Sequence, residues 1–85
     1  MREDIIKTML EILSKMKLAA GKVDGEYVVV CLGHVSSREF IGWVVQAQVT
    51  KGSLCVKREE RFASYEEAKK YFDEMVKKYN LVVVQ

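Results

Sequence analysis

One short segment of the chain is apolar at every position: Tyr27-Val28-Val29-Val30-Cys31-Leu32. Its β-branched composition predicts a β-strand, in which successive side chains point to opposite faces of the sheet. The odd-numbered residues then point one way and the even-numbered residues the other. A sheet that is covered on one side only alternates apolar with polar residues, because its second face meets water. One set is therefore expected in the core, and the other set needs a covering of its own.

Two more strands follow this segment. Residues 40–50 alternate at their far end, and Gly42 within them suggests a bulge. Lys51-Gly52-Ser53 is typical of a tight hairpin turn. Residues 54–62 begin apolar and continue as Lys57-Arg58-Glu59-Glu60-Arg61, so charges stand on both faces. Such a strand is expected at the edge of the sheet, where charge prevents unwanted pairing with other chains.

Amphipathic helices flank the strands. Residues 3–19 carry apolar side chains at helical spacing, over an arc wider than the about 100° of an ordinary surface helix. Gly21 is expected to cap this helix, before a turn over the next four residues. A second helix is predicted from the capping box of Ser64 and Glu67 to a C-terminal cap at Asn80.

The predicted order of elements is α-β-β-β-α-β, with a short apolar strand at residues 81–84. An antiparallel three-stranded meander is followed by a helix that crosses back to this last strand, which is an α+β fold. The simplest arrangement is a two-layer sandwich, with both helices on one face of the sheet and the opposite face less covered. In the alternative arrangement the two helices cover opposite faces and consume the surplus apolar surface.

Composition limits the classes of protein. The 85 residues predict one folded domain, residues 1–85. The net charge is +2, and acidic residues stand beside nearly every basic one, which weakens the case for a nucleic-acid surface without removing it. No apolar run reaches 18 residues, so we expect no membrane span and a cytoplasmic location. Cys31 and Cys55 fall in predicted strands as small apolar residues, with no zinc spacing around them.

Few residues offer catalytic chemistry. The single histidine, His34, falls with Ser36, Ser37 and Glu39 in a polar loop predicted at residues 33–39. These residue types can form a nucleophile, a base and an orienting group, but consecutive loop residues do not supply the spatial arrangement that a triad needs. We therefore expect neither an enzyme nor a cofactor, and interpret the segment as a solvated connection or a recognition loop.

The order of elements also resembles the core of the PD-(D/E)xK nucleases. That family places an aspartate near the start of its second strand and a Glu-x-Lys pair on its third, to hold a metal ion and position water. The matching positions here hold Glu39 and Glu59-Glu60-Arg61, with Lys57 on the wrong side. The resemblance implies a nuclease-like enzyme. This is only a remote alternative, because the chain has no proper Asp…Glu-x-Lys set and a divalent metal is poorly held without two converging carboxylates.

Surplus apolar surface is the main indication of function, because contiguous apolar patches above a few hundred Å² usually mark interfaces. We predict a small non-catalytic interaction domain, an adaptor or regulator that forms a homodimer and binds another protein. The interface is expected on one face of the first strand, on its neighbour and on the first helix: Val28, Val30, Leu32, Val44, Ile6 and Leu10.

A nucleic-acid-binding domain is the alternative function. It would use the charged strand, the polar loop and an open sheet face to contact phosphates and bases. The residues expected to contribute are Lys57, Arg58, Arg61, Arg38, Gln46 and Gln48. Phosphate contacts lose affinity steeply as salt rises whereas apolar contacts do not, so salt dependence separates the two hypotheses.

Overall fold

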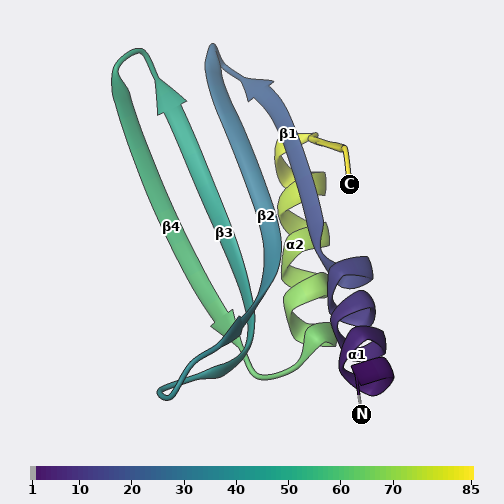
Figure 1. Ribbon diagram of the computed structural model, residues 1–85. Helices are drawn as coiled ribbons and strands as arrows, with labels where there is room; N and C mark the ends of the chain where they lie inside the picture. Colours follow the sequence, from purple (N-terminus) through teal and green to yellow (C-terminus); the bar gives the residue numbers. More distant parts are fainter. Residues whose placement is uncertain (1) are drawn as a thin grey trace.

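The computed structural model of the protein describes residues 2–85. Its elements are α1 (Arg2–Lys15), β1 (Lys17–Val23), β2 (Glu26–Ser36), β3 (Ile41–Lys51), β4 (Leu54–Phe62), α2 (Tyr65–Tyr79) and β5 (Val82–Val83). The strands form one antiparallel sheet in the order β4-β3-β2-β1-β5. Helix α2 packs against one face of this sheet (Figure 1). The predicted α+β class with two layers is confirmed.

The sheet has one strand more than the sequence predicted. Helix α1 ends at Lys15, and residues 17–19, which were expected to complete it, belong to β1 instead. Gly21, expected as the cap of this helix, is also part of β1, where it pairs with Val28. A two-residue turn joins β1 to β2, and its residues Asp24 and Gly25 have φ values of 50° and 80°. Type I′ hairpin turns require positive φ at both central positions, which Asp-Gly tolerates. The turn expected over residues 22–25 is therefore present but tighter, and a strand precedes it.

The core lies between α2 and the even-numbered residues of β2. Val28, Val30 and Leu32 are almost completely buried, and so are Ala68 and Phe72 of α2. Burying one large apolar side chain contributes about 1.5–3 kcal/mol to the free energy of folding. The apolar side of α2 thus selects the even-numbered set as core and leaves the odd-numbered set of β2 on the other face.

Helix α2 begins and ends where the sequence predicts. The backbone N–H of Glu67 donates to the side-chain oxygen of Ser64 at 3.3 Å, which satisfies one of the unpaired donors at the first turn. Asn80 ends the helix in the left-handed conformation, with φ of 53°. The chain then returns to the sheet, where Val82 and Val83 pair with β1. The predicted C-terminal strand is confirmed, and it pairs within the chain.

The connection between β2 and β3 is shorter than predicted. Strand β2 continues to Ser36, so His34 belongs to a strand and the loop contains only residues 37–40. The backbone N–H of Phe40 donates to the Ser37 hydroxyl oxygen at 3.1 Å and closes this loop. The register between β2 and β3 is unbroken through Gly42, so no bulge is present there. The polar composition of residues 33–39 concealed the end of a strand.

Helix α1 has little contact with the core. One residue, Met16, separates it from β1, so it continues beyond the end of that strand, beside the N-terminal end of α2 (Figure 1). The Lys15 ammonium lies 5.2 Å from the centre of the Tyr65 ring of α2. Ile12 packs against the core, but no residue of α1 is buried. Within residues 2–85, no helix therefore lies over the sheet face opposite α2.

Candidate interaction surface

Apart from Lys22 next to the β1-β2 turn, the sheet face opposite α2 is apolar over β5, β1 and β2. Directly opposed residues of antiparallel strands point to the same face, so Val82, Ala20 and Val29 form one row across the three strands. Val29 is 37% exposed and Val82 is 66% exposed. We call this area the open-face patch; from the register it consists of Leu18, Ala20, Val29, Cys31, Val44 and Val82.

Apart from Val44, the strand positions around these rows become polar over β3 and β4. The row of Val29 continues into Gln48 and Lys57, and the row of Cys31 continues into Gln46 and Glu59. Each row therefore changes from apolar to polar halfway across the sheet. One half of the open face suits an apolar partner, and the other half can remain in water.

A second apolar surface lies on α1. Side chains at positions 5, 9 and 13 and at positions 6 and 10 form two adjacent rows along a helix, because residues four apart lie above one another. They are between 54% and 61% exposed. We call this surface the α1 arc; it consists of Ile5, Ile6, Met9, Leu10 and Leu13.

The structure corrects one half of the expected interface. Val28, Val30 and Leu32 lie beneath α2, so they contribute no surface on which a partner could bind. Val44 lies in the open-face patch, and Ile6 and Leu10 belong to the α1 arc. Alternation along β2 identified two sets of side chains, but only the position of α2 shows which set is covered.

The residues expected to contact nucleic acid lie at three places. Four of them share the polar half of the open face: Gln46, Gln48, Lys57 and Arg61. Arg58 points to the opposite face, because it pairs with the buried Ala47. Arg38 is exposed in the loop at residues 37–40. Between Lys57 and Arg61 stands Glu59, whose carboxylate accepts a hydrogen bond from the Arg61 Nε at 3.2 Å and offsets part of the positive charge.

The residues weighed for catalysis do not converge. The His34 ring lies edge-on against the Trp43 ring, with centroids 4.8 Å apart, and Trp43 contacts Tyr65 of α2 in the same way at 5.0 Å. His34 is thus part of an aromatic contact between the sheet and α2. Glu59 and Glu60 follow one another in β4 and point to opposite faces. Among residues 2–85, no group of three histidine, cysteine or acidic residues is placed to hold a metal ion.

The cysteines are not bonded to each other. Cys31 lies on β2 and Cys55 on β4, and β3 runs between these two strands. They therefore do not occupy the adjacent strands that a disulfide would need.

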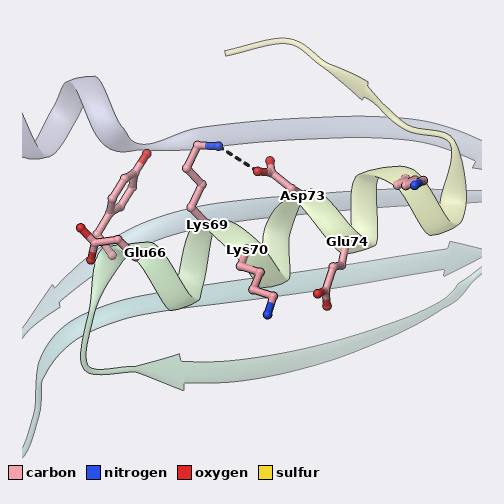
Figure 2. Close-up of a pocket in the computed structure, with 7 residues that line it drawn as sticks. Glu66, Lys69, Lys70, Asp73 and Glu74 are labelled. Carbon is pink, nitrogen blue, oxygen red and sulfur yellow. Dashed lines mark hydrogen bonds and ion pairs between the residues drawn. The ribbon is translucent and has the colours of Figure 1, made fainter.

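A shallow hollow of about 500 Å³ lies along the outer side of α2. Lys69 and Asp73 form an ion pair on one side of the helix, and Lys70 and Glu74 extend on the other (Figure 2). The Lys69 ammonium donates to an Asp73 carboxylate oxygen at 2.8 Å, which raises the pKa of Lys69 above its usual 10.5. Both side chains are about half exposed, so the pair contributes little to stability. The hollow is open to solvent, and the charged side chains that line it are of both signs.

A groove of about 240 Å³ lies between the C-terminal half of α2 and the strands β2, β3 and β4. Val56 of β4 lines this groove and is 55% exposed. It lies on the face opposite the open-face patch, because it pairs with Val49, which packs against the core.

The comparisons with known proteins give no family. A scan against protein-family models found no match, and no curated protein or solved structure matches significantly. No helix of residues 2–85 is long and apolar enough to cross a membrane.

Proposed function

We propose that the protein is a small non-catalytic interaction domain, which forms a homodimer through the open-face patch and the α1 arc. As a dimer it acts as an adaptor or regulator for another macromolecule. The observation that supports this proposal is the pair of apolar surfaces that α2 leaves uncovered. The largest apolar patch on a soluble monomer is about 300–600 Å² and is itself often functional. Two separate exposed apolar surfaces on a chain of 85 residues favour self-association.

Self-association also compensates for small size. A chain of this length buries only about 60–65% of the surface that its unfolded form exposes. Covering the open-face patch in a dimer would complete a second apolar layer that the chain does not complete alone. A two-fold arrangement, in which the same surface of each copy takes part, is the commonest solution among homo-oligomers.

Sedimentation velocity at micromolar concentration tests the dimer, with two matched variants. Val29→Lys places an ammonium in the middle of the open-face patch, whereas Val56→Lys makes the same change on the opposite face. Both positions are exposed in a single chain, so both variants are expected to fold. We expect the wild type and Val56→Lys to sediment as dimers and Val29→Lys as a monomer. A monomeric wild type would refute the homodimer.

A nucleic-acid-binding function has one observation in its favour, which is the gathering of Gln46, Gln48 and Lys57 on the polar half of the open face. Fluorescence anisotropy with mixed DNA and RNA at two salt concentrations tests it. Binding at low salt that falls steeply at high salt would favour this function, because each phosphate contact releases counterions. No binding at low salt would remove it.

A further inference from the structure

We propose that each α1 arc of the dimer lies across the open-face patch of the other copy, so that the helices are exchanged between two sheets. This inference rests on the proposed homodimer and specifies what covers each apolar surface. It differs from a dimer in which the two sheet faces meet directly, and from one in which the two α1 helices pair with each other.

The connection between α1 and β1 keeps α1 away from the open face of its own sheet. A single residue, Met16, joins them. A helix that folds back over the strand it adjoins needs a loop of about 2–6 residues. Contacts of Ile12 with the core and of Lys15 with Tyr65 further hold α1 on the side of α2. The α1 arc therefore does not reach the open face of its own sheet, and a second copy supplies a matching helix.

The α1 arc and the open-face patch match in width. A helix of 14 residues is about 21 Å long and about 10 Å wide. Neighbouring strands lie about 4.8 Å apart, so one helix covers about two strands. The open-face patch lies mainly on the two strands β1 and β2, and the polar side chains of β3 and β4 begin where such a helix would end. The partner's α1 would cover the apolar half and leave the polar half in water.

The buried area favours an arrangement that uses both apolar surfaces of each chain. One helix laid on two strands has a footprint of about 200 Å². Two contacts related by a two-fold axis bury four such surfaces. Their total is about 800 Å² if the surfaces are treated as flat, and protruding side chains add to it. Stable interfaces begin at about 1,200 Å² in total. The flat footprint of the exchanged arrangement is below this value, but it is twice the area that a contact through one apolar surface of each chain would bury.

Mixing two variants tests the exchange. Met9→Glu damages the α1 arc, and Val29→Lys damages the open-face patch. In the exchanged dimer each variant alone has two damaged contacts, and we expect self-association to weaken by at least about ten-fold. In an equimolar mixture one contact keeps both native surfaces and the other pairs Glu with Lys. We expect the mixture to sediment as a dimer at concentrations where each variant alone is monomeric.

The control is Lys7→Glu, which places the same side chain on the polar side of α1 and is expected to leave the dimer intact. If Met9→Glu remains as dimeric as the wild type, the sheets meet directly and the exchange is wrong. If Val29→Lys remains dimeric, the α1 helices pair with each other and the exchange is wrong. A mixture of monomeric variants that does not associate also refutes it. A monomeric wild type instead refutes the homodimer itself.

A cysteine cross-link provides a measurement that does not depend on damaged contacts. Cys31 already lies in the open-face patch, and Cys55→Ser removes the second thiol. In that background Met9→Cys or Leu13→Cys is expected to form a disulfide with Cys31 of the partner, which doubles the mass under non-reducing conditions. Lys7→Cys is expected to form much less. A dimer in which neither arc position cross-links more than Lys7→Cys would overturn the exchange and leave the dimer standing.

Discussion

Val29 and Val30 are consecutive residues of β2, but Val30 is 0% exposed beneath α2 whereas Val29 is 37% exposed on the open face. The two valines differ only in the face to which the pleat directs them. Their environments are therefore opposite, and the same substitution at the two positions separates the core from the candidate surface.

Val30→Lys is expected to unfold the protein, and Val29→Lys is expected to leave the chain folded. A buried ammonium without a partner belongs to the substitutions that cost more than about 4 kcal/mol. The whole domain is expected to have a free energy of unfolding of about 4–13 kcal/mol. Circular dichroism during urea unfolding provides the measurement. Two unfolded variants would mean that both faces of β2 are covered, and the open-face patch would not exist.

Gly42→Ala is expected to destabilise the fold, whereas Gly33→Ala is expected to be tolerated. A Cβ added at Gly42 would lie 2.5 Å from the Phe62 carbonyl oxygen and 2.7 Å from the Phe40 ring. A Cβ added at Gly33 would meet only the Met16 side chain, at 3.9 Å. Overpacking costs about 1–3 kcal/mol, and glycine in a strand costs about 0.5–1 kcal/mol relative to alanine. Thermal unfolding of the two variants compares these effects, and equal melting temperatures would contradict the close approach at Gly42.

Ser64→Ala is expected to lower the free energy of unfolding by about 1 kcal/mol, because the Glu67 N–H would lose its acceptor at the first turn of α2. Ser53→Ala, in the exposed turn between β3 and β4, serves as the control and is expected to change stability by less than about 0.5 kcal/mol. Urea unfolding measures both variants. An unchanged midpoint for Ser64→Ala would show that this cap is not formed in solution.

Most of the fold was predictable because local sequence patterns specify most of its elements. The Ser64 cap, the apolar side of α2 and the charged edge strand are each specified by residues close in sequence, and the structure confirms all three. Strand β1 was missed because Leu18, Ala19 and Ala20 continue the apolar rows of α1 as well as they form a strand. The Asp24-Gly25 pair could have indicated β1, because Asp-Gly is a strong signal for a hairpin and a hairpin needs a strand on each side.

The candidate surface was predictable only in part. The sequence of β2 shows two apolar sets, but nothing local distinguishes Val28 from Val29 as the covered residue. That choice depends on which face α2 packs against, which is decided by contacts between residues more than 30 positions apart. Exposure of the α1 arc likewise follows from the single residue that joins α1 to β1. This short connection could not be predicted, because β1 itself was not predicted.

Phe72→Ala is expected to be among the most damaging substitutions in α2. Phe72 is 1% exposed and is the largest of the fully buried side chains, so its removal leaves a cavity as well as losing the burial. Such changes cost about 3–5 kcal/mol, a large part of the about 4–13 kcal/mol available to a domain of this size. Tyr27→Ala removes a comparable ring that is 59% exposed and is expected to cost less than about 1 kcal/mol. Urea unfolding of both variants, at a concentration where the protein is monomeric, measures the difference. Equal losses would mean that α2 does not cover β2 as described, because the layer between them depends on this ring.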